Sequence, residues 1–188
     1  MLKHIAGHRI TVHCTVTRQQ IQREGYLEEF LAFWSAREEV ARIWMSLYTP
    51  QIGEISDEKL TPADRVRVVT DLAALRPRFP KLQAPQGLLD SYAHPPQSPD
   101  ECIFARTTQS VSADLTTRIT PCQFGGRPDC SNCGCMASAG LSALGRHKVF
   151  GIVPVGMLFE GSLRIGTMAK RARDRRTRAP EAAGSAAV

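Results

Sequence analysis

Five of the six cysteines in this chain lie between residues 102 and 135, and four of them fall in the stretch PCQFGGRPDCSNCGC, residues 121 to 135. A C-x2-C pair lets two thiolates meet one metal centre from a tight turn. Thiolates brought in by a hairpin would complete a tetrahedral zinc site or a four-cysteine iron–sulfur cluster. Nearby glycines let the backbone bend and aim N–H groups at the sulfurs; they are Gly125, Gly126 and Gly134. The candidate ligands are Cys102, Cys122, Cys130, Cys133 and Cys135.

Other roles for clustered cysteines fit this spacing less well. A thioredoxin-type redox pair follows a strand at the start of a helix and has no companion thiols. Cys14 stands apart and alternates with valines along a predicted strand, which is typical of an inert buried cysteine. An all-cysteine set suits zinc and iron–sulfur alike, and five candidates for four ligands leave one spare. We predict a metal site and leave the metal and the spare cysteine open.

The sequence shows no sign of export or of a membrane span. Residues 1 to 13 hold several histidines and basic residues and no apolar core of a signal peptide. The longest apolar run, VFGIVPVGMLF at 149 to 159, is too short to cross a bilayer and contains Pro154. We expect a cytoplasmic protein that does not bind membranes. In a reducing compartment, clustered cysteines indicate metal binding or catalysis rather than disulfides.

The formal net charge of +6 raises the question of nucleic acid. From residue 170 onward six basic residues stand against two acidic ones, a balance of +4, so residues 1 to 169 carry only +2. The excess belongs to the tail rather than to a basic face of a folded domain. We expect residues 167 to 188 to be a disordered, solubilising tail, with a tether to nucleic acid or to a partner as the alternative. We do not expect the folded part to bind nucleic acid.

The first half of the chain alternates predicted strands and helices. Residues 9 to 17, RITVHCTVT, alternate apolar and polar side chains, and residues 42 to 50, RIWMSLYTP, predict a second strand that Pro50 ends. Between them the spacing of apolar residues from Tyr26 to Trp34 predicts an amphipathic helix. This order is typical of a parallel sheet that is covered on both faces.

A second helix is predicted from its start signals. Thr61 is the N-cap, Pro62 takes the first helical position, Asp64 follows three residues after the cap, and Pro77 ends the helix. The expected apolar stripe is Val66, Val69, Leu72 and Ala73. A short helix, GLLDSYA, completes a third unit. Three such units neither close a barrel nor finish an open sheet, so this part is interpreted as the second half of a larger domain.

Beyond a linker at residues 94 to 101 the pattern changes. The segment between Cys102 and residue 121 alternates like a strand. SVSADLTTRITPC predicts two short strands around an ADLT turn, and ASAGLSALG predicts a helix that Gly145 ends. The predicted fold class is α/β: a partial β/α barrel at 1–95, a small cysteine-rich hairpin-plus-helix domain at 96–166 and a basic tail at 167–188.

The arrangement resembles the C-terminal half of radical SAM enzymes that carry an auxiliary cluster domain of the SPASM or twitch type. In that family one cysteine precedes a β-hairpin and another closes it, as Cys102, SVSADLTTRITP and Cys122 do here. The strand TVHCTVTRQQ resembles a late barrel strand of these enzymes, and WMSLYTPQIGE resembles the next. The resemblance covers residues 1 to 165.

The resemblance implies an auxiliary [4Fe-4S] cluster held by four of the five cysteines. It also implies a parent enzyme that cleaves S-adenosyl-L-methionine (SAM) to a 5′-deoxyadenosyl radical and modifies a substrate that the sequence does not identify. Active sites of such barrels lie at the C-terminal ends of strands. There Thr17 and Arg18 would meet SAM, and Tyr48 or Gln51 would line the substrate space. An electron donor such as a ferredoxin or flavodoxin is the implied partner.

The sequence departs from the family at two places. The C-x3-C-x2-C loop that holds the SAM-binding cluster is absent, and Thr116 and Thr117 stand where a glycine usually follows the hairpin turn. We therefore expect at most one cluster and no SAM cleavage by this chain alone. The missing N-terminal half would come from a larger reading frame or from a separate subunit, unless the chain is a relic that only binds metal. The alternative function is a non-catalytic, structural zinc-binding module with a basic interaction tail.

Overall fold

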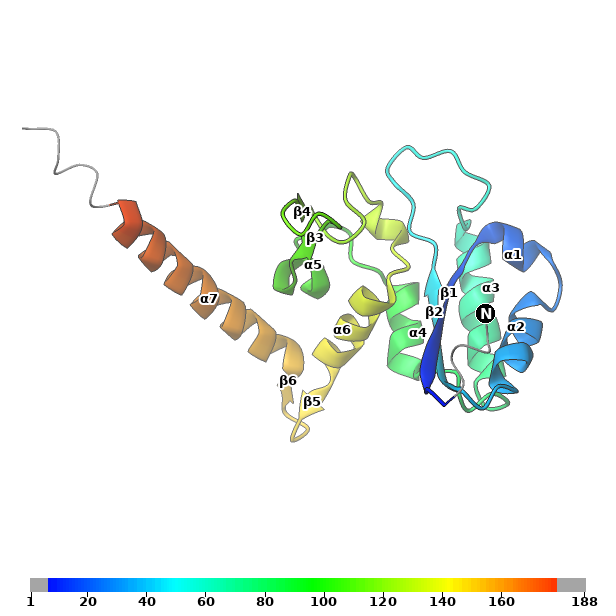
Figure 1. Ribbon diagram of the computed structural model, residues 1–188. Coiled ribbons are helices and arrows are strands. Elements are labelled where there is room, and N and C mark those ends of the chain that lie inside the picture. Colours follow the sequence, from blue (N-terminus) through cyan, green and yellow to red (C-terminus); the bar gives the residue numbers. More distant parts are fainter. Residues whose placement is uncertain (1–6, 179–188) are drawn as a thin grey trace, which may run out of the picture. The chain divides into compact units, whose positions relative to one another are not determined.

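The computed structural model describes residues 7 to 178, with side chains described through residue 175 (Figure 1). The chain divides into two compact units, Met1–Leu144 and Gly145–Val188. All six cysteines lie in the first unit. The cysteine-rich segment therefore belongs to the same unit as the β/α part, and the division falls at Gly145 rather than near residue 96.

Two parallel strands form the centre of the first unit. They are β1 (Ile10–Val16) and β2 (Val40–Leu47), in a register that places His13 beside Trp44 and Val16 beside Leu47. Both strands were predicted. The third β/α unit contributes only one parallel bridge, from Leu82 to Ile43, in place of a full strand.

One face of the sheet packs on the core, and β1 leaves the other face open. The side chains of Cys14 and Val16 are buried, as the alternation predicts. On the opposite face of β1, Thr11, His13 and Thr15 are exposed in the described part of the chain. The expectation that both faces are covered is therefore wrong for β1, and the open face is one that parallel sheets normally bury.

Four helices bury their apolar side chains in one core with the strands. They are α1 (Arg18–Gln22), α2 (Tyr26–Ser35), α3 (Pro62–Leu75) and α4 (Gln86–Ala93). The short helix α1 was not predicted separately; Thr17 caps it and forms a capping box with Gln20. The largest fully buried side chains of this core are Leu31, Ile43, Met45, Leu47, Leu72, Leu89 and Tyr92.

Helix α3 begins as predicted but buries a different face. The Asp64 N–H donates to Thr61 Oγ1 at 3.1 Å, and the Thr61 N–H donates to the Asp64 carboxylate at 2.9 Å, which is a capping box. Val66, expected in the apolar stripe, is 68% exposed, whereas Arg65 is buried. The buried face consists of Arg65, Val68, Leu72 and Leu75. The predicted stripe was wrong at Val66. Spacing of apolar residues favours burial of Val66, but the neighbouring Arg65 is buried instead, because backbone carbonyls accept its hydrogen bonds.

The cysteine-rich segment combines short elements. Cys102 is followed by helix α5 (Ile103–Thr107), which was not predicted. The predicted hairpin is present as β3 (Ser110–Val111) paired antiparallel with β4 (Arg118–Ile119). Its turn is organised by the Asp114 carboxylate, which accepts the N–H groups of Thr116 and Thr117 at 2.8 Å each. A short 3-10 helix, Cys130–Asn132, precedes α6 (Met136–Arg146), and Gly145 lies inside α6 rather than ending it.

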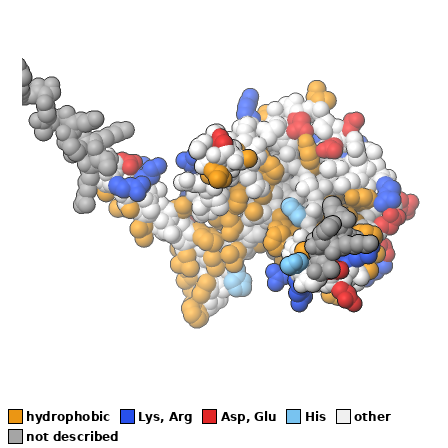
Figure 2. Space-filling view, in the orientation of Figure 1, with side chains coloured by type: hydrophobic (Ala, Val, Ile, Leu, Met, Phe, Trp, Pro, Cys, Tyr) orange, Lys and Arg blue, Asp and Glu red, His pale blue; other side chains and the backbone are white. Residues whose placement is uncertain are grey.

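The second unit holds a small hairpin and one long helix. The hairpin pairs β5 (Lys148–Val149) with β6 (Val153–Pro154), and α7 (Val155–Arg178) follows. Figure 2 shows hydrophobic side chains at this hairpin, where Phe150 and Ile152 are exposed. Residues 167 to 178 are helical, so the prediction of disorder was wrong for them, because alanine, lysine and arginine are strong helix formers. Residues 179 to 188 lie outside the described residues.

Among residues 7 to 178, no helix combines the length and the hydrophobicity that a bilayer crossing needs.

The corrected face of α3 predicts unequal costs for two truncations on one helix. Leu72→Ala removes a fully buried side chain, and we expect it to lower the free energy of unfolding by about 2–5 kcal/mol. Val66→Ala should change it by less than about 0.5 kcal/mol, because Val66 is largely exposed. Urea unfolding followed by circular dichroism measures both, and equal losses would contradict this packing.

Candidate metal-binding site

All five cysteines that the spacing singled out line one pocket, here called the cysteine pocket. Cys102 comes from the start of α5, Cys122 follows the β3–β4 hairpin, and Cys130, Cys133 and Cys135 come from the loop that leads into α6. The other lining residues are apolar or uncharged: Thr49, Pro96, Pro99, Phe104, Ala105, Phe124, Pro128 and Ser138. Segments far apart in the sequence therefore bring sulfur atoms together in an uncharged surrounding.

The end of β2 positions the cysteine loop, residues 127 to 135. The Leu47 N–H donates to the Gly134 carbonyl, and the Gly134 N–H donates to Thr49 Oγ1, both at 2.9 Å. The Asp129 N–H donates to the Pro50 carbonyl at 2.8 Å. These contacts place C-x2-C-x-C at the C-terminal end of a parallel strand.

Glycine is required at residue 134 for this contact. A Cβ atom there would lie 2.0 Å from the Leu47 carbonyl oxygen and 2.5 Å from the Leu47 Cβ. The two nearest atoms, the Leu47 carbonyl oxygen and carbon, belong to the backbone, so no side-chain movement relieves the overlap. The expectation that Gly134 serves the cysteine loop is thus explained by close approach of two backbones.

Backbone N–H groups face three of the sulfurs. Cys102 is the N-cap of α5, and its Sγ accepts the Ala105 N–H at 3.5 Å. Cys135 directly precedes α6, and its sulfur accepts N–H groups from Ala137 and Ser138 in the first turn. The Cys135 N–H in turn hydrogen-bonds the Cys133 sulfur. Donors at helix N-termini favour thiolates, and such N–H···S contacts are the kind that tune metal–thiolate centres.

Burial disfavours the thiolate form of three of these cysteines. Burial raises the pKa of Cys133 to about 11, and the Cys135 N–H opposes the rise only in part. Burial also raises the pKa of Cys130 and of Cys135, and nearby sulfurs add to the shift. Metals bind the thiolate, so loading this pocket must release protons and should be favoured as pH rises.

The sulfurs share a pocket without standing in a ligand sphere. Across residues 7 to 178, no three His, Cys, Asp or Glu side chains are grouped in a way that would hold a metal ion. All six cysteines are free thiols. Cys102 Sγ lies 3.1 Å from Ser138 Oγ, and Gln123 Nε2 donates to Cys135 Sγ at 3.2 Å. The donor set fits a four-thiolate centre in number and chemistry, and binding requires the side chains to turn toward a common point.

A buried arginine holds the C-x2-C turn from the other side. Arg65 on α3 donates to the carbonyl oxygens of Asn132 and Cys133 at 2.9 Å each, and to that of Tyr92 at 3.2 Å. The Tyr92 hydroxyl donates to the Met45 carbonyl on β2 at 2.5 Å. The turn is thereby tied to α3, α4 and β2 together.

A larger cavity of about 510 Å³ adjoins the cysteine pocket. Both are lined by Thr49, Phe124 and Cys135, so one sulfur faces the two spaces. The strands contribute His13, Trp44 and other side chains from the face of the sheet that β1 leaves open. The lining contains no lysine, arginine, aspartate or glutamate, and His13 Nε2 lies 2.7 Å from Ser46 Oγ.

The four residues proposed on the SAM side lie at the ends of β1 and β2, where each makes its own contacts. Thr17 caps α1, and Arg18 Nε lies 3.3 Å from the Asp64 carboxylate. The Tyr48 hydroxyl donates to Glu54 at 2.5 Å, and Gln51 Oε1 accepts the Arg127 N–H at 2.7 Å. Of the four, only Tyr48 lines the 510 Å³ cavity.

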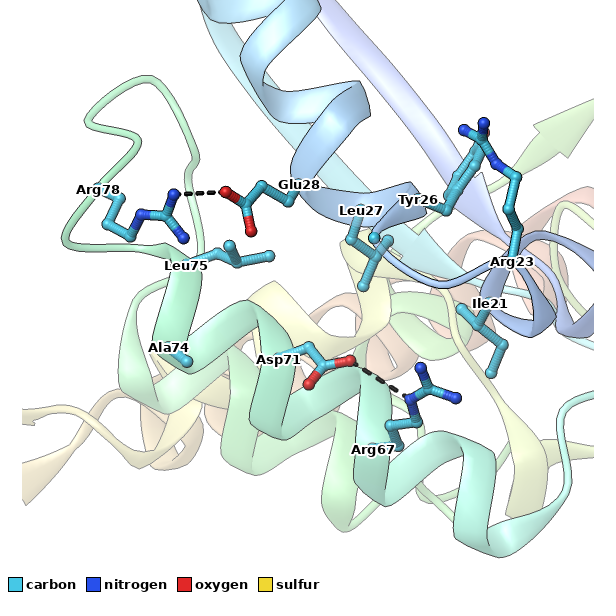
Figure 3. A pocket seen from close by; sticks show the side chains of 11 residues that line it. Ile21, Arg23, Tyr26, Leu27, Glu28, Arg67, Asp71, Ala74, Leu75 and Arg78 are labelled. Carbon is cyan, nitrogen blue, oxygen red and sulfur yellow. Dashed lines mark hydrogen bonds and ion pairs between the residues drawn. The ribbon is translucent and has the colours of Figure 1, made fainter.

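A second cavity, of about 350 Å³, lies where α2 faces α3 and shares no lining residue with the cysteine pocket (Figure 3). Its charged groups are all paired, and Arg23 pairs with Glu29, which lies outside the lining. Arg67 Nε lies 3.7 Å from the Asp71 carboxylate, and Arg78 pairs with Glu28. These pairs leave little charge for a ligand, so we do not consider this cavity the functional site.

Sequence reasoning missed the residues that support the sulfurs. Thr49, Gln123 and Ser138 carry no motif, because their contacts are made across the fold. Arg65 had a weak signal: it lies three and seven residues before Val68 and Leu72, on the same helical face. No local pattern distinguishes such an arginine from an exposed one.

Comparisons with known proteins do not identify a family for this chain. No protein-family model, curated protein or solved structure matches the chain. The resemblance to radical SAM enzymes therefore rests on the cysteine spacing and the hairpin.

The backbone contact at residue 134 predicts a position-specific effect of one methyl group. We expect Gly134→Ala to detach the cysteine loop and to lower the melting temperature strongly, because the new Cβ would overlap the Leu47 backbone. Gly140→Ala on α6 is the matched control. Nothing lies within 4 Å of its Cβ, so it should be neutral or stabilise by up to about 1 kcal/mol. Thermal unfolding of both variants is the measurement, and a Gly134→Ala protein as stable as the control would contradict the contact.

Proposed function

We propose that this chain is the C-terminal portion of a radical SAM protein and that its cysteine pocket binds an auxiliary [4Fe-4S] cluster. One observation carries the proposal: five thiols from three separate segments line one pocket. A single buried cysteine is common and inert. Five free cysteines that line one pocket without forming a disulfide are typical of metal ligands.

The surroundings of the sulfurs support an anionic metal–thiolate centre. Helix N-termini aim N–H groups at Cys102 and Cys135, and a buried guanidinium lies on the carbonyl of Cys133. Four of Cys102, Cys122, Cys130, Cys133 and Cys135 would hold the cluster, which when bound supplies one-electron transfer or an iron that a substrate can ligate. The protein's own part is to exclude water with Phe104, Phe124 and the prolines and to orient the sulfurs.

SAM cleavage would need a second polypeptide segment, because the chain lacks C-x3-C-x2-C. The open face of β1 is where such a segment would pack, since parallel sheets are normally buried on both faces. In the proposed complex the 510 Å³ cavity between that face and Cys135 would be closed by the partner. A ferredoxin- or flavodoxin-like donor and a cytoplasmic location belong to the same proposal.

The proposal predicts iron and sulfide in a fixed ratio. Protein purified without oxygen should contain about four irons and four acid-labile sulfides per chain and absorb broadly near ~400 nm. Cys102→Ser and Cys122→Ser should each lose most of the iron, because each removes a thiol from the cysteine pocket. Cys14→Ser is the control, because Cys14 is buried outside that pocket. The iron content of this variant should equal that of the unmodified protein.

Each other result has a distinct meaning. Full cluster retention in both the Cys102→Ser and the Cys122→Ser variants would contradict the hairpin ligands. One zinc per chain without sulfide would overturn the iron–sulfur proposal and favour the structural zinc module. That module predicts salt-dependent nucleic-acid binding that disappears when residues 167 to 188 are deleted.

A further inference from the structure

Arg65 is a buried cation whose hydrogen bonds all go to neutral acceptors. Its side chain is 8% exposed. Its guanidinium donates to the carbonyls of Asn132, Cys133 and Tyr92 at 2.9, 2.9 and 3.2 Å. Arg65 takes no part in the ion pairs Arg18–Asp64, Arg23–Glu29, Arg67–Asp71 and Arg78–Glu28. The hydrogen-bonding groups are satisfied, but the charge has no carboxylate in contact.

Buried charges are normally paired, because removing an ion from water without a counter-charge is strongly unfavourable. Asp129 is the carboxylate that acts on Arg65 from nearby, and it is already held by Ser131 Oγ at 2.6 Å and by Asn132 Nδ2 at 2.8 Å. Two of the three carbonyls that Arg65 holds belong to the C-x2-C turn itself. The missing counter-charge is therefore expected on the side of the cysteine pocket.

A four-thiolate metal centre has the required sign. Four thiolates carry four negative charges, and a doubly charged zinc ion or [4Fe-4S] core neutralises two of them. A neutral side chain with N–H groups could donate hydrogen bonds to the three carbonyls in place of Arg65. Hydrogen bonding therefore does not explain why the residue here is positively charged.

We propose that Arg65 is the positioning and charge-compensating residue of the metal centre: its planar fork fixes the C-x2-C turn, and its charge stabilises the anionic centre. The inference rests on the proposed metal site and adds a determinant of its electrostatics. Reduction of the cluster by one electron, supplied by dithionite in the test, adds a negative charge. A nearby fixed cation therefore favours reduction and raises the reduction potential.

Two substitutions separate the charge from the hydrogen bonds. Arg65→Gln keeps N–H donors and removes the charge, whereas Arg65→Lys keeps the charge and loses the fork. Arg67→Gln is the matched control, because Arg67 lies on the same helix, is half exposed and pairs with Asp71. Each protein is purified without oxygen and titrated with dithionite, and its iron content and reduction potential are measured.

We expect Arg65→Gln to lower the equilibrium constant for one-electron reduction at least tenfold, which is about 59 mV. Arg65→Lys should stay within threefold of the unmodified protein, and Arg67→Gln should not change it. If Arg65→Gln fails to fold, the Arg65→Lys protein is the test. A tenfold or larger change of its equilibrium constant for reduction would show that geometry and not charge matters, and would overturn the inference. In a zinc-loaded protein, Arg65→Gln should raise the zinc dissociation constant at least tenfold. Arg65→Lys should keep it within threefold, and Arg67→Gln should leave it unchanged.

Failure of the inference and failure of the proposed function are distinguishable. If the unmodified protein takes up neither iron nor zinc, both are overturned. If it loads metal and Arg65→Gln loads the same amount with an unchanged potential or zinc affinity, only the role of Arg65 is overturned.

Discussion

The contact between Gly134 and the backbone of Leu47 is the constraint on which the rest of the candidate site depends. It sets the cysteine loop against the end of β2 at a distance that admits no side chain. From there the chain turns one way into the C-x2-C turn and the other way into α6, so Cys133 and Cys135 lie on either side of the contact. Thr49, Pro50 and Gln51 continue the same docking along the segment after β2.

This docking explains why the cysteine-rich segment and the β/α part are one unit. A hairpin of two-residue strands and a five-residue helix is too small to bury a core of its own. The segment is stabilised by packing on the strands and on α3 and α4, with Arg65 and Tyr92 linking them. Residues 94 to 101 have the composition of a linker, yet they lie within one compact unit. Composition indicates the local backbone conformation and does not indicate what the following segment packs against.

Local signals predicted local structure well. The alternation of β1, the capping residues of α3 and the turn around Asp114 each involve residues only a few positions apart, and all three are present. The face of α3 was mispredicted at Val66 because hydrophobicity is only a proxy for burial. An arginine is buried when carbonyl acceptors meet it, and those acceptors belong to residues 92, 132 and 133, far from it in sequence. The long helix α7 was missed for a related reason, because a charged composition excludes a core but does not exclude a helix.

By itself the sequence determined which residues can serve a metal, since thiol chemistry and C-x2-C spacing are properties of the chain. It also determined strands β1 and β2 and the start of α3, which depend on neighbours within a few residues. Only the tertiary structure decided that all five thiols share a pocket, that Cys14 does not, and that a buried cation lies against the same turn. These facts depend on contacts between segments separated by tens of residues, and no local pattern encodes the distance between such segments.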